Sequence, residues 1–175
     1  YEGIVDELVG ELESAEPVEE TFWTAAVGPD ETVDLLVERL AAADERIIMV
    51  ASSSSQQFDM DTVGDLIVEE LGNALDRGVN VSLLMRPELV SELPESVGER
   101  YRSHLARHEQ FSVRTSHNVS GTFELIDNAE VCIEVPHPLN AEETFAVIDL
   151  KDREFAANVR SEFDPRWEEA DPLTL

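Results

Sequence analysis

The sequence predicts one α/β domain with a mixed parallel and antiparallel sheet flanked by helices, on three observations. Its 175 residues are 42% apolar, which is enough for one sizeable core but short for two full domains. Residues 28–116 alternate amphipathic helical segments with apolar strands, the pattern of parallel crossover units. Residues 121–150 then contain three strands at short spacing, as in an antiparallel meander.

The first segment, residues 1–17, has the pattern of an amphipathic helix. Its apolar residues fall on one helical stripe, and Pro17 closes the segment. The pattern fits a linker or coiled-coil helix that enters from an upstream region. The chain also starts at Tyr1 without an initiator Met, as expected of a fragment of a longer protein. It fits equally a short helix that packs on its own domain, residues 18–175. The stripe consists of Ile4, Val5, Leu8, Val9 and Leu12.

Residues 28–116 supply three helix–strand units. Pro29 and Asp30 are typical of a helix start, and Gly78 suits the left-handed cap of the second helix. The first two strands are continuous apolar runs of the kind that are buried on both faces. In chain order the expected elements are helix 28–44, strand 45–52, helix 60–77, strand 80–86, helix 95–110 and strand 111–116.

The second half continues the sheet and ends on a helix. Asp127 and Asn128 are typical turn residues between the first two of its strands. The closing helix, residues 152–169, is expected to bury Phe155, Val159 and Phe163. The strands are expected at residues 121–127, 130–135 and 143–150.

Acidic residues dominate the charge of the chain. Thirty-nine Asp and Glu face twelve Lys and Arg, which gives a formal net charge of −27, and Lys151 is the one lysine in the sequence. A dispersed acidic excess is typical of a protein in molar salt, where the Debye length falls to about 3 Å and self-repulsion is screened. We therefore expect a halophilic cytoplasmic protein that repels nucleic acid at low salt, because DNA binding requires Lys and Arg.

Two further observations bear on compartment and partners. Cys132 is the single cysteine, so it forms no disulfide within the chain and gives no reason to expect an oxidising compartment. No stretch approaches the roughly 18 consecutive apolar residues of a membrane-spanning helix, and we expect no membrane partner.

The run ASSSSQQ follows the first apolar strand and raises the question of catalysis. A nucleophile elbow and a phosphate-binding loop both need glycines, and the loop also needs a Lys, whereas this run has neither. The serines do stand at the carboxyl end of a parallel strand, where open α/β sheets bind small ligands. The alternative is a solvated loop. The residues concerned are Ser52, Ser53, Ser54 and Ser55.

His104 and His108 lie four residues apart on an expected helix and suggest a metal site. Zinc needs three or four ligands, and the Glu of an H-E-x-x-H motif is missing here. A polar helix face explains the two histidines better, and we predict no metal and no cofactor. His117, just past the strand 111–116, is instead expected near the same sheet edge as the serines.

Two parts of the chain resemble the phospholipase D-like superfamily. Residues 74–84, ALDRGVNVSLL, are similar to the segment that follows the first helix of that superfamily. Residues 120–127, SGTFELID, stand in the place of its catalytic H-x-K-x-x-x-x-D motif. With Asp127 at the motif's Asp, Ser120 replaces the nucleophilic His and Thr122 replaces the phosphate-binding Lys. The resemblance implies one phospholipase D-like half.

These replacements lead us to expect no enzyme. The chemistry needs the His to attack phosphorus and the Lys to balance the phosphate charge, and Ser and Thr supply neither function. Glu134 and Val135 stand where the superfamily has Gly-Ser. The alternative, a residual phosphodiesterase or a serine hydrolase, would require His117 as general base.

The chain is also similar to the effector domain of TrmB-type archaeal transcriptional regulators. In that family a winged helix-turn-helix is joined by a helical linker to a phospholipase D-like sensor domain. The resemblance implies that residues 1–17 lead to an upstream DNA-binding domain, with Ile4, Leu8 and Leu12 as linker or dimer contacts. It rests on the order of the linker-like helix, Gly28-Pro29-Asp30, the Arg-Gly-Val segment, residues 120–127 and the closing helix with Trp167-Glu168.

Sugar-responsive members of that family carry a further β-rich subdomain, for which no residues remain after Leu175. We therefore assign no sugar-binding residue and expect an unknown small-molecule effector. Arg86 is the cation placed to meet an anionic ligand, with a surface ion pair as its alternative. The candidate ligand-binding residues are Ser52, Ser53, Ser54, Ser55, Arg86, Ser116, His117, Ser120 and Thr122.

Phospholipase D-like folds pair two halves face to face, so a single half implies a symmetric homodimer. Ligand binding would then favour one of two dimer arrangements and change the spacing of the upstream helices. DNA would be a partner only through the upstream domain. The alternative is a module that oligomerises and binds no ligand.

Overall fold

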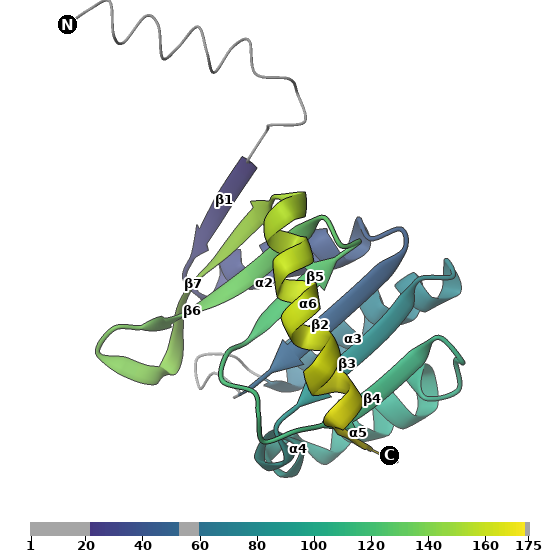
Figure 1. Ribbon diagram of the computed structural model, residues 1–175. Coiled ribbons are helices and arrows are strands. Elements are labelled where there is room, and N and C mark those ends of the chain that lie inside the picture. The colour runs from purple at the N-terminus through teal and green to yellow at the C-terminus, as the bar shows by residue number, and fades with distance from the viewer. Residues whose placement is uncertain (1–21, 53–59, 174–175) are drawn as a thin grey trace, which may run out of the picture.

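The structure, a computed structural model, describes residues 22–52 and 60–173. Its centre is an eight-stranded mixed sheet in the order β1-β7-β6-β5-β2-β3-β4-β8, with helices on both faces (Figure 1). The predicted fold class is therefore confirmed. The expected linker helix with Ile4, Leu8 and Leu12 lies outside the described residues, as do Ser53, Ser54 and Ser55.

The parallel part of the sheet follows the predicted helix–strand units. The strands β2, β3 and β4 run parallel, and the helix α3 connects the first two of them. Gly78 follows α3 with a φ of 88°, the left-handed conformation expected of its cap. The elements are α2 (Pro29–Ala41), β2 (Arg46–Ala51), α3 (Met60–Asp76), β3 (Asn80–Met85) and β4 (Phe111–Thr115).

The antiparallel part is a meander that β1 extends at the edge. Asp127 and Asn128 lie in the three-residue loop 127–129 from β5 to β6, with φ of 55° and 54°, the left-handed conformation that Asp and Asn tolerate. β1 pairs with β7 along its whole length. These strands are β1 (Phe22–Val27), β5 (Phe123–Ile126), β6 (Glu130–His137) and β7 (Asn140–Lys151).

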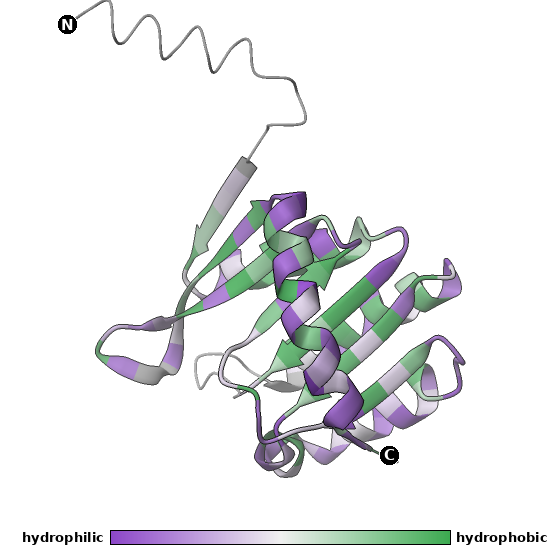
Figure 2. Ribbon diagram, in the orientation of Figure 1, coloured by the Kyte–Doolittle hydropathy of each residue, from purple (hydrophilic) through white to green (hydrophobic). Residues whose placement is uncertain are grey.

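Both faces of the central strands are buried, because helices cover both sides of the sheet. On one side α2 and α3 pack on alternate residues of β2 and β3, such as Met49 and Leu83. On the other side α6 (Arg153–Glu169) packs through Ala156 and Phe163 on the intervening residues, such as Leu84. The strands are accordingly apolar along their length, whereas α6 alternates polar and apolar residues (Figure 2).

Three details differ from the sequence-based expectation. The helix α4 (Pro87–Glu92) was not predicted, because six residues are too few to show a helical period. The expected helix 95–110 ends early, as α5 (Glu95–Arg100) followed by the π-helical turn η2 (Tyr101–Leu105). The two-residue strand β8 (Asp171–Pro172), which pairs with β4, is too short for any pattern. Within the described ranges, no helix is long and apolar enough to cross a membrane.

Candidate functional site

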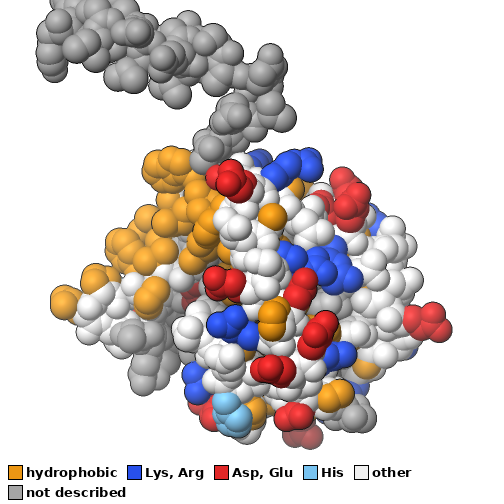
Figure 3. Space-filling view, in the orientation of Figure 1, with side chains coloured by type: hydrophobic (Ala, Val, Ile, Leu, Met, Phe, Trp, Pro, Cys, Tyr) orange, Lys and Arg blue, Asp and Glu red, His pale blue; other side chains and the backbone are white. Residues whose placement is uncertain are grey.

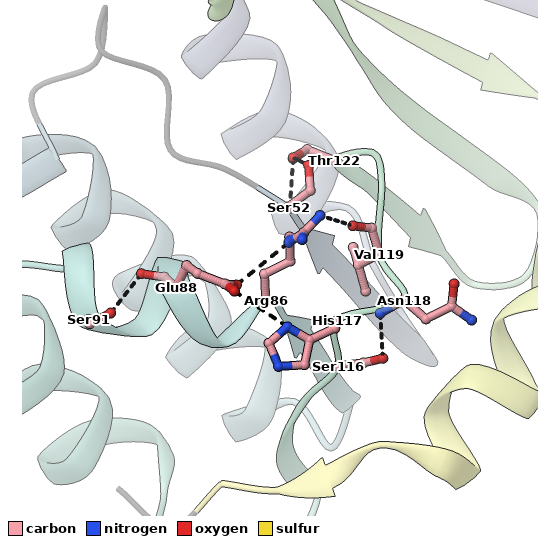
Figure 4. A network of polar contacts seen from close by, with 9 residues as sticks. All are labelled: Ser52, Arg86, Glu88, Ser91, Ser116, His117, Asn118, Val119 and Thr122. Atoms are coloured by element: carbon pink, nitrogen blue, oxygen red, sulfur yellow. Dashed lines mark hydrogen bonds and ion pairs between the residues drawn. The ribbon is translucent and has the colours of Figure 1, made fainter.

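Polar side chains from separate segments gather at one edge of the sheet (Figure 4). Ser52 follows β2, Arg86 follows β3, and Ser116 and His117 follow β4. Thr122 immediately precedes β5, which lies beside β2. The carboxyl ends of parallel strands meet at one edge, so the structure brings these five predicted residues together.

Thr122 ties the end of β2 to the start of β5. Its Oγ1 accepts a hydrogen bond of 3.2 Å from the backbone N–H of Ser52 and lies 3.3 Å from the Ser52 hydroxyl oxygen. The carbonyl of Thr122 accepts a 3.0 Å bond from the N–H of Glu134 on β6. A hydroxyl that joins neighbouring strands therefore stands where the resemblance expects a phosphate-binding Lys.

Arg86 is engaged by its surroundings and remains partly exposed. Its Nη1 donates a 3.0 Å hydrogen bond to the carbonyl of Val119, and its Nε lies 3.6 Å from a Glu88 carboxylate oxygen. The other oxygen of Glu88 lies 3.4 Å from Nδ1 of His117. The pKa of Glu88 is lowered chiefly by a backbone hydrogen bond, with the charges of His117 and Arg86 adding to this. Arg86 thus forms the ion pair that was the alternative to a free cation.

A groove of about 310 Å³ lies next to this edge, on the face of the sheet that carries α6. Ser120, Gly121 and Thr122 form one wall, and Phe163 and Arg166 of α6 form the other. Its floor consists of buried apolar residues of the central strands. The groove combines apolar surface with hydroxyl groups, the guanidinium of Arg166 and the carboxyl groups of Glu134 and Glu162, a composition suited to a small polar ligand.

Asp127, which the resemblance aligns with the Asp of the motif, has a structural role. Its carboxylate accepts hydrogen bonds from the backbone N–H groups of Asp44, Glu45 and Arg46 at the start of β2. The shortest, from Glu45, is 2.7 Å. Asp127 follows the last residue of β5, whereas Thr122 precedes the first. It therefore anchors the far end of the strand and takes no part in the edge that Figure 4 shows.

We expect Asp127→Ala to lower the free energy of unfolding by about 2–4 kcal/mol, because backbone donors lose a charged acceptor and Ala disfavours a positive φ. Chemical denaturation measures the change. Asp127→Asn, which tolerates the left-handed conformation, should lose less. Asp44→Ala is the matched control, since the exposed Asp44 contributes only its backbone N–H to this contact. An unchanged denaturation midpoint for Asp127→Ala would contradict the anchoring role.

A second cluster of acids, which the sequence reasoning did not find, lies inside the protein. Glu124 is 6% exposed and Asp149 is 1% exposed. Burial raises the pKa of Glu124 well above its usual value, and the nearby charge of Glu134 adds to the effect. Burial also raises the pKa of Glu134 to about 7, and burial together with Asp149 raises that of Glu130 to about 7. The alternation in EVCIE could have indicated this cluster, because it places the side chains of Glu130 and Glu134 on the same face of the strand as Cys132.

Part of this cluster resembles a metal-ligand set but does not fit one. Potential ligand atoms of Glu130, Cys132 and Asp149 lie within 4.8 Å of one another. Arg39 donates a 3.3 Å hydrogen bond to Glu130 and already supplies positive charge. The Cys132 thiol lies 3.4 Å from an Asp149 oxygen, and burial raises its pKa, which opposes the thiolate that a metal needs.

The other residues that the sequence singled out, His104, His108 and Ser120, do not form a common site. His104 Nδ1 lies 2.8 Å from the Ser103 hydroxyl, while His108 Nε2 lies 3.9 Å from an Asp76 oxygen on α3. The π-helical turn η2 interrupts the regular four-residue spacing on which the pair depended. Ser120 is exposed at the groove.

Comparisons with known proteins identify a sequence family and structures of similar fold. The family described as "Domain of unknown function (DUF7436)" matches residues 17–173. No curated protein matches the chain in sequence. Nuc, a phospholipase D family member from Salmonella typhimurium, has a similar structure with a TM-score of 0.69 at 15% identity. The similarity covers 89% of this chain and 100% of that one.

Two other solved structures are similar at comparable levels. NucT from Helicobacter pylori has a TM-score of 0.65 at 16% identity, over 88% of this chain and 100% of that chain. TrmBL2, described as an archaeal chromatin protein with a novel mode of DNA binding, has a TM-score of 0.66 at 18% identity. That similarity covers 98% of this chain and 61% of TrmBL2. At these identities the similarities show a phospholipase D-like fold.

Proposed function

We propose that this chain, which belongs to the family described as a domain of unknown function (DUF7436), is the ligand-sensing and dimerisation domain of a TrmB-like transcriptional regulator. The observation that carries the proposal is a phospholipase D-like sheet with hydroxyl groups, Ser52 and Thr122, bonded together at its strand-end edge beside an open groove. The shared fold of TrmBL2, which its description places among DNA-binding chromatin proteins, supports a regulatory role.

The proposed domain has no phosphodiesterase activity. Ser120 and Thr122 stand at the positions of the nucleophile and the phosphate-binding cation, and the Thr122 hydroxyl is engaged by Ser52. His117, the candidate general base, is 74% exposed in its side chain and lies beside Glu88. Turnover of a phosphodiester by the wild type that disappears in His117→Ala would overturn this part of the proposal.

DNA binding is assigned to a region upstream of Tyr1, reached through the linker of residues 1–17. The net charge of −27 opposes direct contact of this chain with DNA. The gene sequence upstream of Tyr1 tests the assignment: we expect about 80–100 residues that encode a winged helix-turn-helix with a basic recognition helix. A second half with an intact H-x-K-x-x-x-x-D motif would instead indicate one side of an asymmetric enzyme.

In the proposed mechanism an effector binds at the strand-end edge and the groove, and favours one of two dimer arrangements. A ligand shifts such an equilibrium only by its difference in affinity for the two states. Here the contact between Ser52 and Thr122, and that between Arg86 and Val119, join the strand ends that line the site. The setting that we propose is the cytoplasm of a halophilic archaeon, where high salt screens the charge of the dimer.

Dimerisation is assigned to an apolar area on the sheet face that carries α6. Trp23 and Val27 on β1 are 64% and 52% exposed, and α6 does not cover them. The register places Trp23 opposite Leu150 and Val27 opposite Ala146, so β7 continues the same face. Figure 3 shows hydrophobic side chains gathered over β1, β7 and β6. An oligomerisation module without a ligand would use the same face, and ligand binding separates the two proposals.

A further inference from the structure

A second cavity, of about 130 Å³, lies on the other side of the sheet, beneath α2, α3 and α4. Its walls are apolar, and include Leu36 of α2, Ile67 of α3 and Leu89 of α4. It reaches the strand-end edge at Ala51 and Thr122, and so adjoins the polar contacts of Figure 4. An apolar cavity of about 150 Å³ is large enough for a molecule of the size of benzene.

Buried polar groups line this apolar cavity, and one of them lacks a hydrogen-bond partner. Glu124 is 6% exposed and lines the cavity. Thr32, 4% exposed, also lines the cavity, and its Oγ1 is buried without a hydrogen-bond partner there. Glu134 accepts a hydrogen bond from Thr144 and faces the same space. Native proteins rarely leave buried polar groups unpaired, which indicates an unfilled binding site.

We propose that this cavity binds a small amphipathic amine, with its ammonium group between Glu124 and Glu134 and its apolar body against Leu36, Ile67 and Leu89. Two carboxyl groups in one apolar cavity can be satisfied together by a cation that has several N–H donors. A cavity of this size admits a ligand of about six non-hydrogen atoms. The net charge of −27 attracts cations and disfavours anions throughout the molecule.

Amine binding should release protons. Burial raises the pKa of both carboxyl groups, so they bind protons in the empty cavity and lose them to pair with an ammonium group. Tyr101 also lines the cavity, and burial raises its pKa to about 12, so it stays neutral. The other titratable groups that face this region are Cys132 and Glu130 on β6, Asp149 on β7 and Arg39 on α2.

This inference rests on the proposed function for its role: the amine would be a second effector of the same sensor domain, bound on the face of the sheet opposite the groove. Isothermal titration of the 175-residue protein with isopentylamine, at neutral pH and molar salt, tests it. We expect a dissociation constant of about 1 mM or lower, and a heat that depends on the ionisation enthalpy of the buffer. Isopentanol, which has the same shape and no charge, should bind at least about tenfold more weakly.

Variants locate the site. Glu124→Gln should fold, because it keeps the shape and removes a buried ionisable group, and should weaken amine binding at least about tenfold. Glu99→Gln on the exposed surface of α5 is the matched control and should bind as the wild type does. The inference is wrong if isopentylamine fails to bind, if isopentanol binds equally well, or if Glu124→Gln has no effect.

The same titration series separates this inference from the proposed function. If the amine binds through Glu124 but leaves the association of the protein unchanged, the amine site stands, its role as an effector fails, and the groove of the proposed function is untouched. If no amine binds, the amine site fails. The proposed dimer is then still tested by sedimentation velocity, and the proposed DNA-binding domain by the gene sequence upstream of Tyr1. Sedimentation velocity with and without isopentylamine provides the readout.

Discussion

The free energy of unfolding should fall by about 3 kcal/mol or more as the pH rises from about 5 to about 8. The cause is the group of buried carboxyls on β5 and β6. Burial raises the pKa of Glu134 from 4.5 to about 7, and burial also raises the pKa of Glu124 well above its usual value. A carboxyl with a raised pKa binds its proton more tightly in the folded state. Its stabilising contribution is therefore complete below the unfolded pKa and is lost as the pH rises through the folded pKa.

The expected change in the free energy of unfolding follows from the raised pKa of Glu134 alone. About 2.5 units at 1.36 kcal/mol per unit correspond to about 3 kcal/mol for a well-buried group. Glu124 and Glu130 act in the same direction, whereas the lowered pKa of the exposed Glu88 acts in the opposite direction. Molar salt screens the repulsion among surface acids, so measurements at high salt isolate the buried carboxyls.

Denaturant unfolding of Glu134→Gln across this pH range is the decisive comparison. An amide has the shape of the carboxyl and does not titrate, so the variant should lose much of the pH dependence and be more stable than the wild type at about pH 8. The exposed Glu99→Gln variant should follow the wild type. A wild-type stability that rises from pH 5 to pH 8 would show that these carboxyls are solvated in the folded protein.

The strand and helix order of the domain was predictable because its signals are local. Runs such as RIIMVA and NVSLLM on β2 and β3 are long enough to identify as buried strands, and Gly78 marked the end of α3. Short elements had no such signal. The helix α4 has six residues and the strand β8 has two, so tertiary contacts and not sequence periodicity determine them.

The edge in Figure 4 was also predictable, because it depends only on where parallel strands end. Ser52, Arg86, Ser116, His117 and Thr122 came together as this rule predicts. The partners of Arg86 did not follow from it, since they lie on α4 and in the segment before β5. Whether these residues bind a ligand remains a prediction.

The buried carboxyls escaped prediction for a physical reason. An alternating strand such as FELI suggests one buried face and one solvated face, with Glu124 on the solvated side. Helices cover both faces of this sheet, so alternation does not distinguish core from solvent here. Glu124 therefore lies beneath α2 and α3, beside Met49 on the neighbouring β2.

The double variant Trp23→Glu, Val27→Glu should be monomeric under conditions in which the wild type is a dimer. Both residues point from the edge strand β1 onto the apolar face that α6 leaves uncovered. A wild-type dimer would bring together two chains of −27 each, so it requires apolar contact and screening by salt. Two added acids at the centre of the contact would remain unpaired and desolvated, which opposes association strongly.

Sedimentation velocity at molar salt and at low salt measures the outcome. The wild type should be a dimer at molar salt and dissociate as the salt concentration falls. Leu66→Glu is the matched control: Leu66 on α3 is 38% exposed, and α3 packs on the face of the sheet opposite α6. It should remain a dimer. A double variant that still dimerises would place the interface elsewhere, whereas a wild type that is monomeric at molar salt would remove the dimer from the proposed function.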